Sequence, residues 1–342
     1  MSEMKDLLKV QWASVALMAV LALAFGDAAA GAAELAVYTA RNLALIRPVF
    51  AAYSRETGTV IDYLNDESEA LLERLRSEGS ATTADIFLTV DAGSLWQAAG
   101  EGLLQPLGDE ALAKNVPEFL RDPRGQWYGV STRTRTIVYS TDRVRPQDLS
   151  TYEDLASPKW RGRLCLRTSG SVYNRSLVAM MIADGGVEKT ESTVGGWVRN
   201  LARKPFPKDE NVMLAISAGQ CDVGIVNSYY YGRLMKKNPD YPLALFWPDQ
   251  DGAGVHLDIS GAGVTRHTDD RAEAVRFLVW LTSEKAQRLF ADPNMEYPVN
   301  PRVKPHPDVA AWGDFKPCSS HISGSGEFRE EAEKLMERTG YR

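Results

Sequence analysis

The chain has 342 residues, of which 44% are hydrophobic and 25% charged, and its formal net charge at pH 7 is −6. This composition is typical of a soluble globular protein, and the absence of a basic block argues against nucleic acid as a partner. The cysteines, Cys165, Cys221 and Cys318, form no C-x-x-C pair and histidine is scarce, which argues against a zinc site.

Residues 1–33 have the features of a secretory signal peptide. Lys5 and Lys9 precede an apolar run at residues 12–25, and small residues follow. The run is shorter than the roughly 20 residues that a membrane-spanning helix needs. We therefore expect cleavage near Ala30 or Ala33 and export to the periplasm, rather than a membrane anchor. The remaining chain is long enough for two domains.

Strands and helices alternate in the first part of the predicted mature chain. The hydrophobic pattern predicts strands at 35–39, 60–64 and 84–90, and helices at 43–57, at 67–78 and around Trp96. Alternation at this spacing is typical of a mostly parallel sheet with helices on both faces.

Two long strands are predicted at 129–139 and 255–264. Between them a second α/β unit contains predicted strands at 163–167 and 221–226. After the second long strand, one helix is predicted from Arg271 to Phe290. A chain that leaves one unit, builds another and returns forms two lobes with a cleft between them, hinged by the two crossing strands. We expect lobe 1 to contain residues 34–133 and 262–300, and lobe 2 to contain residues 134–261 and 301–342.

Cys165 and Cys221 fall in the predicted strands 163–167 and 221–226. In an oxidising compartment they can form a disulfide if these strands are adjacent, and otherwise they are buried thiols. The sequence leaves both outcomes open.

Several segments match a known pattern in the same order along the chain. They are Tyr38-Thr-Ala-Arg41 and residues 84–93, 129–135, 157–162, 167–174, 227–233, 259–264 and 296–300. Together they resemble the periplasmic ferric-iron-binding proteins of ABC importers, the FbpA/FutA group of type II solute-binding proteins. The resemblance implies a two-lobed α/β protein that captures Fe(III) with a synergistic anion, usually carbonate, and delivers it to an ABC permease in the inner membrane. We expect a monomer that is not an enzyme, since no Gly-x-Ser-x-Gly, HExxH or Walker motif is present.

Fe(III) prefers anionic oxygen, which a tyrosinate supplies. A free phenol titrates near pH 10, and a bound metal lowers that pKa. The tyrosines at 229–231 follow the predicted strand 221–226, at the end where open α/β sheets gather ligands. Alone, such a triplet favours packing at a helix start, or a stacking surface for an organic ligand, over metal ligation. The resemblance assigns Tyr229 and Tyr230 as iron ligands and Tyr231 to packing. It assigns Tyr173 as a third ligand, the alternative being a core residue near the start of a helix at 174–183.

A second group comprises Arg133 and the turn Ser169-Gly170-Ser171. A glycine-containing turn at a helix start presents N–H groups to an anion, and arginine adds a charged fork. The resemblance implies that these residues hold the synergistic anion, with Arg135 in support. The alternative for both arginines is a salt bridge across the hinge.

The lobe 1 ligands of many relatives are replaced here. Asn42 and Leu43 stand where relatives have a histidine or a His-Tyr pair, and Val90 stands where one branch has a glutamate. We interpret the histidines at 256, 267, 306 and 321 as structural or exposed. The expected iron ligands are then three tyrosines from lobe 2. This departure leaves open a chelated form such as ferric citrate, or another anionic solute such as a phosphonate.

Overall fold

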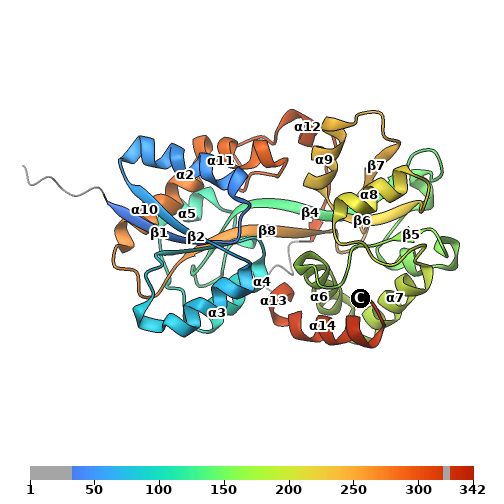
Figure 1. Cartoon of the computed structure of the whole chain (residues 1–342), viewed down its shortest axis with the longest axis horizontal. Helices are drawn as coiled ribbons and strands as arrows, with labels where there is room; N and C mark the ends of the chain where they lie inside the picture. Colours follow the sequence, from blue (N-terminus) through green and yellow to red (C-terminus); the bar gives the residue numbers. More distant parts are fainter. Residues whose placement is uncertain (1–32, 319–323) are drawn as a thin grey trace, which may run out of the picture.

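The computed structural model describes residues 33–318 and 324–342, and it shows an elongated molecule with two halves (Figure 1). The strands β4 (Tyr128–Ser140) and β8 (Val255–Val264) run from one half into the other. The predicted signal peptide, except Ala33, and His321 lie outside the described residues. Within the described ranges, no helix is long and apolar enough to cross a membrane.

The first half begins with alternating strands and helices. These are β1 (Glu34–Thr39), α2 (Leu43–Thr57), β2 (Val60–Asn65), α3 (Ser68–Glu78), β3 (Ile86–Thr89), α4 (Ala92–Gly100) and α5 (Glu110–Asn115). Helix α2 shows how local sequence sets an element. The Asn42 side chain accepts a hydrogen bond from the backbone N–H of Ala44 at its start, and Gly58 ends it with φ of 79°. Apolar residues three and four positions apart bury one face.

The second half contains the elements between the two long strands, together with the C-terminal helices. Its first group is β5 (Leu164–Cys165), α6 (Val172–Gly185), α7 (Val187–Asn200), α8 (Asp209–Ser217), β6 (Val223–Asn227), α9 (Ser228–Lys237) and β7 (Leu243–Phe246). After β8 the chain returns to the first half with α10 (Arg271–Leu281) and α11 (Glu284–Ala291), which contribute buried residues to the core of that half. It then forms α12 (Pro307–Ala310), β9 (Pro317–Cys318), α13 (Gly324–Glu327) and α14 (Arg329–Arg338). Short 3₁₀ helices are η1 (Gly79–Ala81), η2 (Glu118–Leu120), η3 (Pro146–Asp148), η4 (Glu153–Ala156), η5 (Pro158–Trp160) and η6 (Asp292–Asn294).

One mixed sheet runs through both halves. Its strand order is β2-β1-β3-β8-β4-β6-β5, with β7 paired to β4 and β9 to β8. The strand β1 is parallel to β2 and β3, whereas β8 is antiparallel to both β3 and β4. The strand β4 pairs with β8 over its first part and with β6 and β7 over its second part. The two long strands therefore connect the halves through backbone hydrogen bonds.

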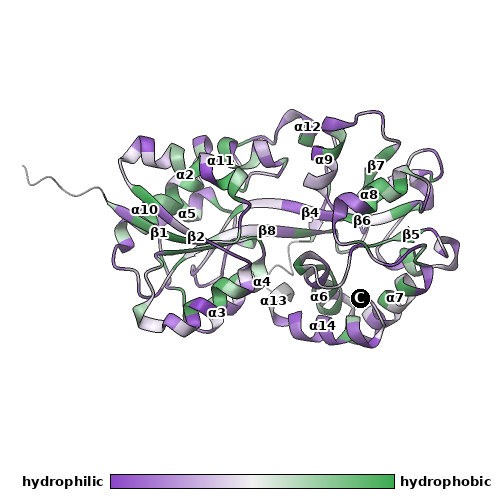
Figure 2. Ribbon diagram, viewed as in Figure 1, coloured by the Kyte–Doolittle hydropathy of each residue, from purple (hydrophilic) through white to green (hydrophobic). Residues whose placement is uncertain are grey.

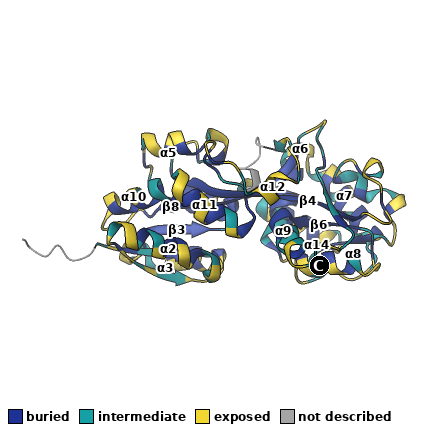
Figure 3. Ribbon diagram, turned by 90° about the horizontal axis from the view of Figure 1, so that it is seen from above, coloured by how far each residue is buried: buried dark blue, intermediate teal, exposed yellow. Residues whose placement is uncertain are grey.

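Each half has its own hydrophobic core. The first core includes buried residues up to Val130 in β4 and from Leu257 in β8. The main core of the second half includes Ile137 in β4, Val255 in β8 and residues of α14. Apolar residues gather on the strands and on the inner sides of the helices (Figure 2), whereas exposed residues lie on the outer helices (Figure 3). The middle of β4, between these cores, is polar but fully buried.

Three predicted elements differ from the observed ones. The predicted helix from Arg271 to Phe290 is two helices, because the Ser283 side chain accepts a hydrogen bond from the N–H of Ala286 and starts α11. The predicted strand 163–167 is only β5, two residues long. The predicted strand 221–226 is β6 at Val223–Asn227, and α9 (Ser228–Lys237) follows it at once, so the tyrosine triplet lies in the first turn of α9.

Strand pairing decides whether Cys165 and Cys221 form a disulfide or remain buried thiols. The strands β5 and β6 are parallel neighbours, and Cys165 forms a disulfide with Cys221, which lies just before β6. Cys318 is buried.

Candidate functional site

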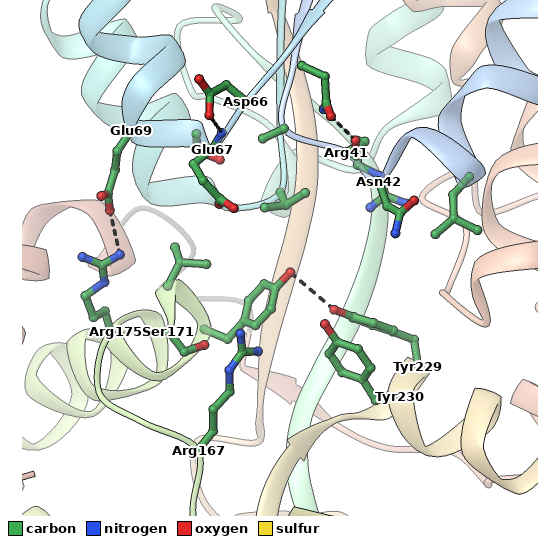
Figure 4. A pocket seen from close by; sticks show the side chains of 18 of the residues that line it. Arg41, Asn42, Asp66, Glu67, Glu69, Arg167, Ser171, Arg175, Tyr229 and Tyr230 are labelled. Carbon is green, nitrogen blue, oxygen red and sulfur yellow. Dashed lines mark hydrogen bonds and ion pairs between the residues drawn. The ribbon is translucent and has the colours of Figure 1, made fainter. Parts of the chain in front are cut away.

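A cleft of about 800 Å³ lies between the two halves (Figure 4). One side is formed by the loops that precede α2 and α3, and the other by the starts of α6 and α9. The polar residues that line it are Arg41, Asn42, Asn65, Asp66, Glu67, Ser68, Glu69, Arg167, Ser171, Tyr173, Arg175, Tyr229, Tyr230, Arg233 and Glu296.

The three predicted tyrosine ligands lie together on the second side. Tyr229 and Tyr230 are in the first turn of α9, directly after β6, and Tyr173 is in the first turn of α6. The Tyr229 hydroxyl donates to the Tyr173 hydroxyl over 3.3 Å. The ring centroids of Tyr229 and Tyr230 are 4.2 Å apart, and both side chains project into the cleft (Figure 4). The strand-to-helix turn thus brings neighbouring side chains to one side.

Burial raises the pKa of Tyr173, and it raises the pKa of Tyr229 well above the usual value for a phenol. At Tyr229 the neighbouring phenols of Tyr173 and Tyr230 add to the effect. The Arg133 guanidinium partly opposes the shift in pKa at both residues. A cation that binds these oxygens as phenolates must therefore displace protons.

Guanidinium groups surround the tyrosine rings. The Cζ atoms of Arg133 and Arg167 are 5.3 Å and 5.7 Å from the ring centroid of Tyr173. The Cζ atom of Arg233 is 4.8 Å from the ring centroid of Tyr229. These distances are typical of cation–π contacts, and the positive charges favour the ionised form of the phenols.

Arg133 is fully buried at the middle of β4. Its Nη1 donates to the Ser260 hydroxyl over 2.8 Å, and its Nη2 donates to the Val90 carbonyl. Its Nε has no hydrogen-bond partner among the described residues. Both bonded acceptors are neutral oxygens, so these contacts are not the salt bridge considered as an alternative.

The predicted anion turn is only partly in the cleft. Gly170 and Ser171 line it, and Ser171 is the N-cap of α6. The Ser171 hydroxyl is buried and has no hydrogen-bond partner in the described structure. Ser169 instead lines an adjoining surface pocket beside Glu333.

Arg167 is a cleft residue that the sequence reasoning did not assign. Its Nε and Nη1 atoms are buried, and neither donates a hydrogen bond within the described structure. The carboxylate of Asp209 is 3.8 Å from Nη1, too far for a good hydrogen bond. The sequence feature that could have identified Arg167 is its place in the matching segment 167–174.

A buried ion pair between Arg41 and Glu296 lines the cleft. It was not predicted from the sequence. Arg41 donates to both carboxylate oxygens of Glu296 over 3.1 Å, and Ser131 donates to the same carboxylate over 2.6 Å. Burial alone would raise the pKa of Glu296, but Arg41 and Arg133 lower it below its usual value. Both members belong to segments of the resemblance, yet 255 positions separate them.

The remaining predicted positions have structural contacts. Leu43 is the first residue of α2. Arg135 does not reach the cleft, because its buried guanidinium pairs with Asp209 over 3.0 Å. Tyr231 packs edge-on against Trp312 and donates to a backbone carbonyl.

The three described histidines lie outside the cleft lining. His256 is buried beside Asp258, with 3.3 Å between Nε2 and the carboxylate. The Nδ1 atom of His306 accepts from the N–H of Asp308 at the start of α12, and His267 is exposed. Across the described ranges, no cluster of His, Cys, Asp or Glu is suited to a metal ion. The clustered phenol oxygens of the cleft suit a hard cation once they are deprotonated.

Comparisons with known proteins agree with this architecture. The family model for bacterial extracellular solute-binding proteins matches residues 49–317. Iron uptake protein A2 from Synechocystis is 43% identical over 289 residues, which cover 82% of this chain and 84% of that protein. Iron uptake protein A1 from the same organism is 38% identical over 315 residues, covering 90% and 88%.

Solved structures of FutA proteins have the same fold as this chain. The structure of FutA (IdiA) from Trichodesmium in complex with iron and citrate ligands has a TM-score of 0.85 and 37% identity, and the match covers 90% of this chain and 100% of that one. Apo FutA2 from Synechocystis has a TM-score of 0.85 and 39% identity, covering 91% and 100%. The fold is therefore that of the FutA and FbpA type II periplasmic binding proteins. The chain belongs to the bacterial extracellular solute-binding protein family.

Proposed function

We propose that this protein captures Fe(III) in the periplasm and delivers it to an ABC permease in the inner membrane. The observation that carries the proposal is the cluster of Tyr173, Tyr229 and Tyr230 on one side of the cleft, with two hydroxyls 3.3 Å apart. Iron uptake proteins among the relatives support the same cargo. Three phenolates match the charge of Fe(III) and provide the hard oxygen donors that it prefers.

In this proposal the phenolates leave part of the iron shell to a synergistic anion such as carbonate. Arg133 together with Gly170 and Ser171, the part of the predicted turn that lines the cleft, holds that anion. The unpartnered Nε of Arg133 and hydroxyl of Ser171 support this role, and Arg167 adds two unpartnered N–H groups. A planar anion suits a guanidinium beside the first-turn N–H groups of a helix, since those groups lack partners within the helix.

Capture also involves movement of the two halves. We assign residues 34–133 and 262–300 to lobe 1, and residues 134–261 and 301–342 to lobe 2, acting as a monomer. The separate hydrophobic cores and the two connecting strands support a hinge in β4 and β8.

Single Tyr→Phe variants test the ligand assignment. Phenylalanine removes one oxygen and keeps the ring, so Tyr229→Phe and Tyr230→Phe should fold, weaken iron binding at least about 100-fold and lose most tyrosinate-to-iron charge-transfer absorbance. Tyr231→Phe is the matched control, because its hydroxyl bonds a backbone carbonyl away from the cleft lining. If both ligand variants keep the affinity and colour of the wild type, the assignment is wrong.

A chelated cargo such as ferric citrate is a second candidate, favoured by the cleft volume of about 800 Å³. That space is far larger than one ion with a small anion needs. The FutA structure from Trichodesmium contains iron and citrate ligands. Mass spectrometry under native conditions after loading with iron and citrate distinguishes the two, since only the chelate adds one citrate per iron.

A further inference from the structure

The lobe 1 side of the cleft contains polar groups that are mostly engaged by other contacts. The Asn42 side-chain oxygen caps α2, and the Asn65 side-chain nitrogen donates to two backbone carbonyls. One carboxylate oxygen of Asp66 accepts from the N–H of Glu67 over 2.8 Å. Glu69 pairs with Arg175 over 2.6 Å, and it also pairs with Arg329. Asn42 and Asn65 are neutral, and the carboxylates of Asp66 and Glu69 each already accept a hydrogen bond or form an ion pair.

Glu67 is different from these neighbours. It is the residue before α3, and its side chain makes no capping hydrogen bond with that helix. Its carboxylate has no hydrogen-bond or ion-pair partner among the described residues, and it is exposed. Figure 4 shows the side chain projecting into the cleft from the side opposite Tyr229 and Tyr230.

We infer that Glu67 is the lobe 1 ligand of the iron site, an inference that rests on the proposed function. Its carboxylate is a hard anionic oxygen donor, which Asn42, Leu43 and Val90 are not. When the cleft closes, Glu67 binds the cation held by the tyrosines of lobe 2. Three phenolates, one carboxylate and a bidentate anion then provide about six oxygen donors, the number of an octahedral shell.

The charges near the site are compatible with this arrangement. Three phenolates neutralise Fe(III), so Glu67 and the anion add negative charge. Arg133 and Arg167 lie within 6 Å of the Tyr173 ring, at 5.3 Å and 5.7 Å, and supply compensating positive charge. Because Glu67 belongs to lobe 1, its bond to the cation also couples iron binding to closure of the hinge.

The test compares Glu67→Gln with Glu73→Gln. Both remove one carboxylate from the same part of the chain, but Glu73 lies on the outer face of α3, paired with Arg76. In buffer without added carbonate or citrate, Glu67→Gln should weaken Fe(III) affinity about 10- to 100-fold in competition with a chelator. Glu73→Gln should match the wild type. Circular dichroism of the iron-free proteins shows that both variants fold.

Electron paramagnetic resonance of the loaded proteins provides a readout that a structural role would not change. Replacing a ligand should alter the high-spin Fe(III) signal in Glu67→Gln, while the tyrosinate colour per iron is kept. Small-angle scattering should show less compaction on loading than in the wild type. An affinity and a resonance signal equal to those of Glu73→Gln would overturn the inference and leave the tyrosine site intact. Failure of the wild type itself to bind coloured iron would instead reject the proposed function.

Discussion

Phenolate ligation makes iron capture dependent on pH, and the raised pKa values of Tyr173 and Tyr229 make their deprotonation harder. Burial keeps both phenols protonated in the empty cleft, so binding of Fe(III) as a phenolate complex releases protons. Acidification reverses this exchange. We expect the apparent affinity to fall about tenfold per pH unit for each proton released, over the range from about pH 8 to pH 5. Competition titrations at several pH values measure this slope, and a flat profile would contradict phenolate ligation.

The stability of the folded protein also depends on pH, through Asp249 and independently of iron. Burial raises the pKa of Asp249 to about 7, and the negative charges of Glu153 and Asp184 add to the effect. The pKa of Asp249 is higher in the folded protein than in the unfolded chain. The protonated carboxyl therefore contributes its full stabilisation of the folded protein below about pH 4, and this contribution is lost as pH rises through about 7.

Replacing Asp249 with asparagine should therefore stabilise the protein in alkaline buffer. Asparagine keeps an acceptor for the N–H of Tyr152 and tolerates the φ of 60° at this position. After allowance for partial exposure, we expect the free energy of unfolding to rise by about 1–2 kcal/mol at about pH 8, and the difference to vanish near pH 4. Urea unfolding at both pH values measures it. A variant less stable than the wild type at pH 8 would show that the carboxylate is needed in its charged form.

At the residue scale, the sequence was informative where function depends on residue type. The resemblance grouped Tyr173, Tyr229 and Tyr230, and the structure places all three on one side of the cleft, whereas the triplet alone did not distinguish a ligand from a packing residue. The Arg41–Glu296 pair and Arg167 could not be predicted, since arginine and glutamate are common and their contacts depend on folded geometry. Arg135 was predicted to support the anion, but the buried carboxylate of Asp209 binds it.

At the element scale, hydrophobic period predicted most of the strands and the helices that follow β1, β2 and β3, whereas α5, α7, α8 and α14 were not predicted. The helix 43–57 and the strand 255–264 agree with the observed bounds. The largest errors concern boundaries that local hydrogen bonds decide. Ser283 starts a new helix within an apolar pattern that continues past it, and α9 begins as soon as β6 ends. The apolar pattern continues past Ser283 without a break, and no turn separates β6 from α9, so the pattern could not locate these boundaries.

The disulfide between Cys165 and Cys221 is expected to stabilise the second half. It links β5 to Cys221, two positions before β6, and joins residues that are 56 positions apart. The loop that it closes restricts the unfolded chain, so replacing both cysteines with serine should lower the free energy of unfolding by about 2–4 kcal/mol. Urea unfolding of the double variant and of the reduced wild type checks this value.

Iron affinity of the folded double variant should be nearly unchanged. Cys221 lies at the end of β6 opposite to Tyr229, so the bond does not hold the tyrosines directly. Loss of iron binding in a folded double variant would mean that the bond positions the site.

At the scale of the whole molecule, ion pairs across the cleft are expected to bias the hinge. Glu69 on α3 contacts Arg175 on α6 and Arg329 on α14, so its charge connects the two halves. These groups are partly exposed, and such pairs contribute about 1 kcal/mol or less. Glu69→Gln should therefore open the iron-free protein in small-angle scattering and weaken iron binding no more than about fivefold. An unchanged scattering profile would show that packing alone sets the opening.

The central claim is that this chain binds Fe(III) through tyrosinates. Metal analysis together with a visible spectrum tests it most directly, on protein isolated from the extracytoplasmic fraction without chelators and then titrated with Fe(III). We predict up to one iron per chain and a broad visible charge-transfer band that grows in proportion to bound iron and disappears on acidification. Colourless protein that retains no iron after titration, or iron bound without that band, would contradict the account.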